Sequence, residues 1–478
     1  MFHRSSHIIY LFSFFIGILL LFSCSSYNRQ VSNYYTSLRQ GNYENAARAI
    51  DNNRLLKKKR NRLLYLLERG KVCHLLQQYD SSNRYFNEAD QIMESSRTSV
   101  KDMALGTLLN PMMQTYHGED FEKYLVHYYK TLNYLQLGQP DEALVEARRI
   151  SLRSYAQEDK AGNKDRYSDD AFSFMLQGMI YEKNEDINNA FIAYRNAVDV
   201  FVKNNGSYYG VKMPEQLKKD VLRTAYQNGF VDELGRYEKL LNTTFSKEEK
   251  TEEGELILFW ENGSAPVKQQ QDIFFSLFKD AGGGFFFADG GGLYNVPFDF
   301  SSGYNRDNIR LEDLRGFRVA LPRYQVQPLY YSEASLQSGN SSYLFEQAES
   351  INTLAFSTLQ ERMLKELSST LTRLAIRKLT EAAVRPEEKK ATDSKKEKNN
   401  KDRQEAIALG LQLFNFASEK ADTRNWQSLP HTIYYTRVPL KKGLNEITIQ
   451  VGGSSSKTIR FSVRANGGLQ FQNICTLK

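Results

Sequence analysis

Cysteine and proline are scarce in this sequence, and its opposite charges nearly balance. Three cysteines among 478 residues are too few for a disulfide framework or a four-thiolate zinc site. Ten prolines and 29 glycines exclude a collagen-like or proline-rich chain. The net charge of +7 is too small for this length to indicate nucleic-acid binding. Apolar residues make up 41% of the chain, which is enough to bury cores, and the length predicts two or three domains.

An apolar run of 15 residues, 8–22, lies close to the N-terminus. It has the length of a secretory signal core and is shorter than the ~20 residues that span a bilayer. The run ends at Leu21-Phe22-Ser23-Cys24, which resembles the bacterial lipobox. The resemblance implies that residues 1–23 are a signal peptide and that Cys24 receives a diacylglyceryl thioether and an N-acyl chain such as palmitate. A plain cleaved signal peptide and an uncleaved anchor are the alternatives.

The residues after Cys24 bear on the location of the anchor. No acidic residue follows Cys24 directly, so there is no obvious inner-membrane retention tag. Two or more acyl chains hold a protein stably at a bilayer. We therefore expect an outer-membrane anchor facing the periplasm, with exposure on the cell surface as the alternative.

Residues 24–245 have the periodicity of helices packed in pairs. Four stretches resemble one another and the tetratricopeptide repeat (TPR), whose period is about 34 residues. They share recurring small residues, among them Gly41, Gly138 and Gly178, at irregular spacing. The resemblance implies a curved array with a concave face that binds peptides or proteins. A helical array without true repeats is the alternative. Three tyrosine pairs are candidates to line the concave face: residues 34–35, 128–129 and 208–209.

Residues 255–478 form a second, β-rich domain in this interpretation. The apolar stretch 255–263 ends in an Asn-Gly turn pair, and two later stretches alternate apolar and polar residues as strands with one buried face do. A helical insertion is expected over about 344–420, and it includes the charged, solvated loop 385–403. The fold class is therefore α+β, with a TPR-like helical array followed by a small β-sandwich or barrel. After residue 263, the strand-like stretches are 317–336, 431–440 and the two alternating stretches, 444–453 and 457–468.

The segment from Ala281 to Phe300 contains two glycine triplets that flank Phe285, Phe286 and Phe287. No Gly-Lys-Ser/Thr follows the glycines, so the segment lacks the motif of a phosphate-binding loop. The three phenylalanines either pack on the β-rich domain or form an apolar finger that contacts a membrane or a partner. They are our candidate interaction loop.

Several segments in this order resemble one family, bacterial lipoproteins with a TPR-like N-terminal half. These segments are Cys24, 124–150, 255–268 and 421–447. The last contains the order Asp-x-Arg-x-Trp-x-x-Leu-Pro, in which Asp422, Arg424 and Trp426 form a candidate constellation. An Asp–Arg pair with Trp anchoring the final strands is the structural interpretation, and a grip on a ligand is the functional one.

No familiar catalytic motif is present. HExxH, GxSxG and CxxC do not occur, and His74 beside Cys73 has no further ligand at metal-binding spacing. We therefore predict a protein that is not an enzyme, with no catalytic residue, no cofactor and no metal. The predicted function is a lipid-anchored scaffold that binds protein partners in the cell envelope. The alternative is an envelope lipoprotein that binds glycan or peptidoglycan and regulates wall synthesis.

Overall fold

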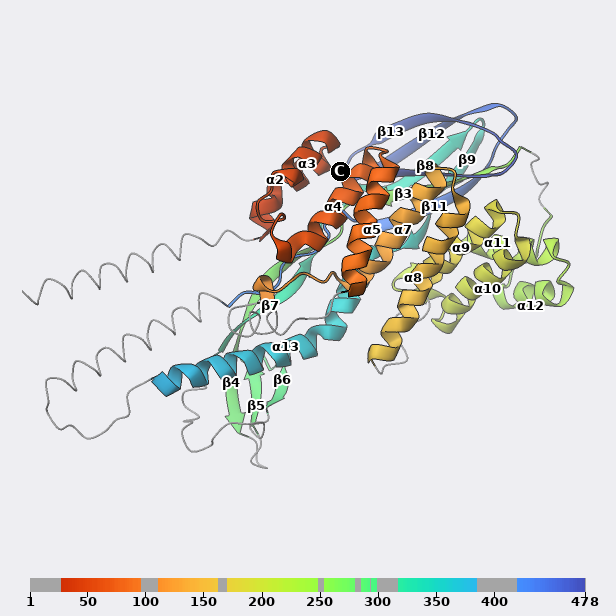
Figure 1. Cartoon of the computed structure of the whole chain (residues 1–478). Coiled ribbons are helices and arrows are strands. Elements are labelled where there is room, and N and C mark those ends of the chain that lie inside the picture. The colour runs from red at the N-terminus through yellow and green to blue at the C-terminus, as the bar shows by residue number, and fades with distance from the viewer. Residues whose placement is uncertain are drawn as a thin grey trace, which may run out of the picture.

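The structure is a computed structural model that describes eight segments of the chain: residues 27–95, 111–161, 170–247, 253–279, 285–292, 294–298, 317–384 and 419–477. Cys24, the predicted signal peptide and the predicted charged loop 385–403 lie outside the described residues. Figure 1 shows a row of helices packed beside β-sheets, with one long helix, α13, crossing the lower part of the view. The predicted α+β class is confirmed.

The array consists of helices that pack in sequential pairs, each helix against the one before and after it. Short turns join the two helices of a pair, as in other antiparallel helical hairpins. The hairpin β1–β2 (Ser207–Tyr208 and Val211–Lys212) lies between the last two pairs. The pairs are α2 (Tyr27–Arg39) with α3 (Tyr43–Asp51), α4 (Arg62–Leu75) with α5 (Tyr79–Ser95), α7 (Asp120–Gln136) with α8 (Pro140–Ala161), α9 (Ala171–Lys183) with α10 (Ile187–Lys203), and α11 (Glu215–Gln227) with α12 (Val231–Leu241).

The turn inside each helix pair contains one residue in the left-handed region. Glycine occupies this position in three of the turns, but Gln77 and Glu185 adopt it at φ 59° in the other two. L-residues adopt this conformation at a steric cost, so glycine is the residue expected there. The sequence alone therefore does not reveal the turns at Gln77 and Glu185. Gly178, which the sequence groups with Gly41 and Gly138, lies inside α9 and not in such a turn. The three glycines of these turns are Gly41, Gly138 and Gly229.

Two glycines inside helices let an aromatic ring pack directly on the backbone. A Cβ atom at Gly70 of α4 would lie 2.6 Å from the ring of Phe86 in α5. A Cβ atom at Gly178 of α9 would lie 2.5 Å from the ring of Tyr194 in α10. The aromatic residue follows its glycine by sixteen positions in both pairs. The two hairpins thus use the same small-on-large contact, which is the packing logic expected of repeats.

Three sheets make up the remainder of the described chain. The central sheet has the order β10-β11-β3-β14, in which β14 runs parallel to β3 and the other pairs are antiparallel. The outer sheet has the order β13-β12-β8-β9, and the distal sheet the order β6-β5-β4-β7. Their strands are β3 (Glu255–Asn262), β4 (Val267–Lys279), β5 (Phe285–Asp289), β6 (Asn295–Phe298), β7 (Phe317–Gln325), β8 (Tyr331–Ser338), β9 (Ser341–Leu344), β10 (Glu346–Glu349), β11 (Thr432–Pro439), β12 (Leu444–Gly453), β13 (Lys457–Arg464) and β14 (Leu469–Thr476).

The central sheet lies between the array and the outer sheet. Alternate residues of a strand point to opposite faces, and both faces of β3 are buried. Ile257 and Phe259 belong to the core shared with the array helices, whereas Leu258 and Trp260 belong to the core shared with the outer sheet. One apolar core therefore continues across the predicted domain boundary between residues 245 and 255.

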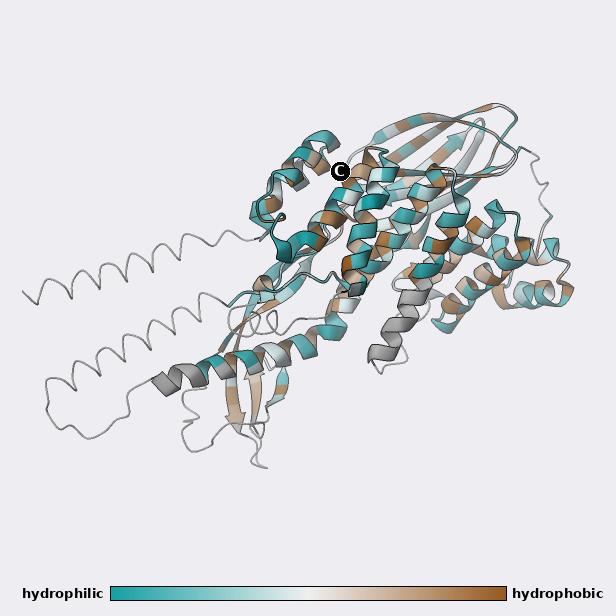
Figure 2. Cartoon of the chain, viewed as in Figure 1, coloured by the Kyte–Doolittle hydropathy of each residue, from teal (hydrophilic) through white to brown (hydrophobic). Residues whose placement is uncertain are grey.

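The distal sheet packs separately against α13 (Ile351–Val384). Phe275, Phe287 and Phe317 of the sheet share a core with Leu367 and Leu371 of the helix. Figure 2 shows β5 and the second half of β4, next to β5, mostly in the brown shades of apolar residues. This sheet–helix unit is an addition to the predicted sandwich.

Two predicted elements have other boundaries in the structure. The predicted strand 317–336 is two strands, β7 and β8, in different sheets, because the segment containing Pro328 leaves the distal sheet between them. The helix predicted from residue 344 begins at Ile351, because 341–344 and 346–349 pair as β9 and β10. The Ser350 hydroxyl accepts a hydrogen bond from the Thr353 backbone N–H at 3.2 Å and so caps the helix.

Candidate functional site

The inner face of the array is covered by the C-terminal half of the chain. We expected a face open to peptides or proteins, but the first helix of each pair contacts the sheet region instead. The physical reason is that β3 is apolar on both faces and needs a second covering layer. The contacts are Asn28 to the Lys268 carbonyl, Lys71 to Glu261, Gln136 to the Phe471 carbonyl, Lys183 to the Leu469 carbonyl, and Asp220 to Arg437.

Two of the predicted tyrosine pairs lie inside this interface. Tyr34 donates a hydrogen bond to buried Glu68 at 2.7 Å. Tyr129 donates to Glu261 of β3 at 3.0 Å, and Glu261 also pairs with Lys71 of α4. The side chains of Lys71 and Glu261 are both fully buried. Tyr129 therefore fixes the array to the sheet, whereas Tyr34 links two helices of the array. Both are buried and are not available to a partner. The third pair, Tyr208 and Tyr209, belongs to the hairpin β1–β2 and its turn and is partly buried.

A cleft of about 540 Å³ lies where the array, the distal sheet and α13 meet. One wall is the segment before α7, which includes the 3-10 turn Pro111–Met113, and the opposite wall is a polar stripe of α13. The rest comes from Lys268 of β4, Ala320 and Pro322 of β7, and residues 421–422. The volume lies within the range of small-molecule sites.

Charged side chains bridge the two walls of the cleft. Glu119, at the start of α7, accepts from both Lys268 and Arg362. Burial alone would raise the pKa of Glu119, but these two cations lower it to about 2. Glu366, one turn along α13, lies 3.8 Å from Arg362, and burial raises its pKa. The cleft thus holds cations and anions in nearly equal number.

A second carboxyl group lies behind the wall. Glu122 accepts from the backbone N–H of Trp426 at 2.7 Å and from the Tyr116 hydroxyl at 2.6 Å. Burial, and then the negative charge of Glu119, raise the pKa of Glu122 to about 7. The two neighbouring carboxyl groups therefore have pKa values that are far apart, a pattern that marks functional sites and also buried structural networks.

The predicted constellation of Asp422, Arg424 and Trp426 is split between the cleft and the core. Asp422 lines the cleft, and its carboxylate accepts from Arg424 at 2.6 Å. Arg424 is buried and also donates to the Gln114 carbonyl at 3.0 Å, so it holds the cleft wall in place. Trp426 packs against Phe86 and Tyr129 of the array, at ring-centroid distances of 5.7 and 5.8 Å, rather than among the final strands.

The three phenylalanines of the candidate interaction loop lie on β5. Phe287 is buried in the core between the distal sheet and α13. Phe286 faces the other way and stacks on Phe278 of β4 at 5.7 Å, with Phe278 half exposed. For Phe285 the structure describes the backbone, which pairs with Lys279 and Phe298.

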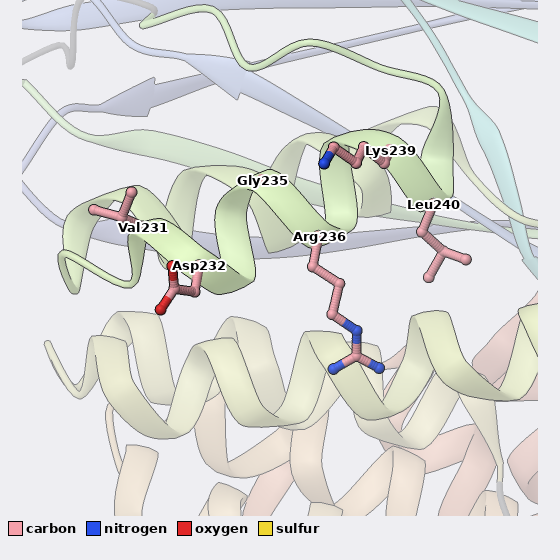
Figure 3. A pocket seen from close by; sticks show the side chains of 6 residues that line it. All are labelled: Val231, Asp232, Gly235, Arg236, Lys239 and Leu240. Carbon is pink, nitrogen blue, oxygen red and sulfur yellow. The ribbon is translucent and has the colours of Figure 1, made fainter.

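A second hollow, of about 720 Å³, runs along α12, the last helix of the array. All its lining residues belong to α12, so it is an exposed helix face. Val231 is 76% exposed and Leu240 is 45% exposed. Figure 3 shows Asp232, Arg236 and Leu240 on one side of the helix. Gly235 lies between them, and a Cβ atom added there would meet nothing within 4 Å.

The described residues hold no group of three or more His, Cys, Asp or Glu side chains placed to bind a metal. His74 lies in the interface, bonded to Asn133 at 2.6 Å, and burial lowers its pKa to about 4. Cys73 and Cys475 are free thiols. None of the described helices is both long and apolar enough to cross a membrane.

The cleft was not predicted from the sequence, apart from Asp422. Its residues come from five segments that lie far apart in the chain, and no motif joins them. One sequence signal was the polar stripe of α13, where Arg362, Glu366, Thr370 and Arg373 recur at helical spacing. The α12 face had a sequence signal of its own in Gly235. Glycine inside a helix lowers helix stability by about 1 kcal/mol relative to alanine, so its presence there indicates another role.

Comparison with known proteins identifies no family, because no protein-family model and no curated protein matches. Among solved structures, the chain is similar to MamA from Desulfovibrio magneticus RS-1, with 14% identity and a TM-score of 0.28 over 45% of this chain and 91% of that one. It is similar to the apo form of RapI, with 11% identity and a TM-score of 0.32 over 48% and 57%. BtubC from P. vanneervenii gives 12% identity and a TM-score of 0.31 over 52% and 91%. At these TM-scores the likeness indicates no function for this chain.

Proposed function

We propose that this protein is a lipid-anchored scaffold of the bacterial outer membrane that binds a helical segment of a protein partner on α12. The observation that supports this function is the mixed character of the helix at the end of the array. Helical repeat arrays end in a helix whose outer face is polar. The face of α12 carries three charged residues, but it also leaves Val231 and Leu240 exposed. Because the inner face is covered by the chain's own sheet, we place the stacking of a further helix at the C-terminal end of the array.

The glycine at the centre of this face specifies the kind of partner. Gly70 and Gly178 each lie under an aromatic ring of the neighbouring helix. Gly235 has the same open backbone but nothing above it. We propose that an aromatic side chain of the partner helix packs there, between Val231 and Leu240. Arg236 and Lys239 on the same face favour acidic residues at the edge of that helix.

Site-specific photo-crosslinking in cells tests this interface. A photo-reactive residue at position 231 should give one discrete adduct with a partner protein. The matched control is position 145 on α8, where Val145 is also exposed, at 53%. The substitution Val231→Glu should remove the partner from affinity-purified material, whereas Val145→Glu should leave it. Equal crosslinking at both positions, or retention of the partner by Val231→Glu, would refute the assignment of α12.

The anchor needs its own experiment. The lipobox resemblance at Cys24 supports it, and Cys24 lies three residues before α2 begins. Mass spectrometry of the mature N-terminal peptide should find a lipid-modified Cys24, and Cys24→Ser should move the protein from the membrane fraction to the soluble fraction. An unmodified thiol at position 24 in wild-type protein would contradict the anchor, while leaving the α12 interface to its separate test.

A further inference from the structure

The cleft between the segment before α7 and α13 has the properties of a ligand site that is separate from the α12 face. We propose that it binds a short neutral oligosaccharide. This places the glycan-binding alternative in one part of the fold, and it is independent of the partner proposed above.

The shape of the cleft favours an extended ligand. Arg362, Glu366, Ser369, Thr370 and Arg373 follow one another along a single face of α13. The last lies eleven positions after the first, which is about 16 Å along a helix. The opposite face of the same helix turns Leu367 and Leu371 into the core of the distal sheet, so the stripe is held at a fixed orientation.

The charges of the cleft are already paired, which disfavours a strongly charged ligand. Glu119 holds Lys268 and Arg362 at one end. Glu419 holds Arg373 and Arg377 at the other. A polyanion would have to displace the carboxylates that already pair with Lys268 and the arginines. A polycation would have to displace these cations from Glu119 and Glu419.

Hydrogen-bonding capacity remains in the walls. The Nε atoms of Arg362 and Arg373 are buried in the wall, and neither has a hydrogen-bond partner among the described residues. Both arginines line the cleft, so a ligand oxygen that reaches either Nε would give this donor its missing acceptor. Between these two arginines lie the hydroxyl groups of Ser369 and Thr370, which both donate and accept.

The apolar side chains of the lining are short apart from one aromatic ring, which favours a sugar over a peptide. They are Pro111, Tyr116, Ala320, Pro322 and Ala421, and Tyr116 is itself buried. Peptide recognition usually requires deeper pockets lined by large apolar side chains. A chain of sugar rings offers hydroxyl groups of both hydrogen-bonding senses and no net charge, which fits paired charges, free donors and hydroxyl side chains.

Two adjacent serines provide a matched test. Ser368 and Ser369 are both exposed on α13, but only Ser369 lines the cleft. Tryptophan at 369 fills the cleft, whereas tryptophan at 368 points away from it, since neighbouring helical residues differ by about 100°. Both variants should melt like the wild type, because neither position is buried.

The experiment is calorimetric titration of the mature protein in detergent with chitotetraose, cellotetraose and maltotetraose, and with an acidic peptide as comparison. We expect saturable binding of at least one tetrasaccharide, reduced at least tenfold by Ser369→Trp and changed less than twofold by Ser368→Trp. No binding of any tetrasaccharide, equal effects of the two variants, or binding of the peptide alone would overturn the proposal.

Discussion

The buried pair of Lys71 and Glu261 gives the most direct test of how the two halves of the molecule are joined. Lys71 comes from α4 and Glu261 from β3, and neither side chain has any exposed surface. Lys71 also donates to the Tyr129 hydroxyl at 2.7 Å. Replacing Lys71 by methionine leaves the Glu261 carboxylate buried without its cation. Loss of one partner of a buried ion pair costs about 3–5 kcal/mol of unfolding free energy.

The double variant separates the pair from its surroundings. Lys71→Met with Glu261→Met removes both charges and leaves methionine side chains that fill much of the same volume. Its loss should be smaller than that of Lys71→Met alone, because no unpaired charge remains. The surface pair of Arg62 and Glu88, about half exposed on each side, is the control, and Arg62→Met should cost about 1 kcal/mol or less.

The two tryptophans of the chain provide the assay. Trp426 lies in the core between array and sheet, and Trp260 lies in the core between central and outer sheets. Urea unfolding is followed by fluorescence in Trp260→Phe and Trp426→Phe backgrounds, so that each core reports separately. The reasoning is refuted if Lys71→Met costs less than its surface control, or if the two single losses at Lys71 and Glu261 simply add in the double variant.

Three further predictions follow from other buried groups. Gly70→Ala should lower the unfolding free energy by about 1–3 kcal/mol, because the new methyl group overlaps the Phe86 ring at 2.6 Å; an unchanged urea midpoint would contradict this. The pKa of Glu122 is raised from its ordinary 4.5 to about 7, so the native state holds a proton that the unfolded chain has released. Stability from this group should therefore fall as pH rises from 4.5 to 7, and Glu122→Gln should flatten that slope in urea titrations. Burial raises the pKa of the thiol of buried Cys73, and it raises that of partly exposed Cys475 to about 12. Iodoacetamide should therefore label both far more slowly in the native protein than after denaturation, as mass spectrometry can show.

Local patterns predicted the elements of this fold better than their partners. Helical periodicity located the array, and alternation located β12 and β13, because both depend only on neighbouring residues. The pattern of 344–350 predicts helix, but residues 346–349 form β10, because they pair with residues 433–435 of β11. Pairing across that distance leaves no trace in the local pattern.

The sequence of β3 indicates that the inner face of the array is covered. The run of β3, ELILFWEN, is apolar without alternation, which is typical of a strand buried on both faces. Such a strand requires two covering layers. The predicted β-sandwich supplies one of them, and the array supplies the other. The cleft could not be predicted for the same reason, because Glu119 and Lys268 come together only when the array packs against the sheets.

The parallel pairing of β14 with β3 has a consequence for biogenesis. A ribosome completes the array long before it makes β14, yet β14 supplies the Phe471 carbonyl that Gln136 contacts and the Leu469 carbonyl that Lys183 contacts. Until β14 is made, Gln136 and Lys183 lack these two acceptors, and one edge of β3 is unpaired. A stop codon before residue 469 would remove β14, and with it the neighbour of β3 and both contacts to the array.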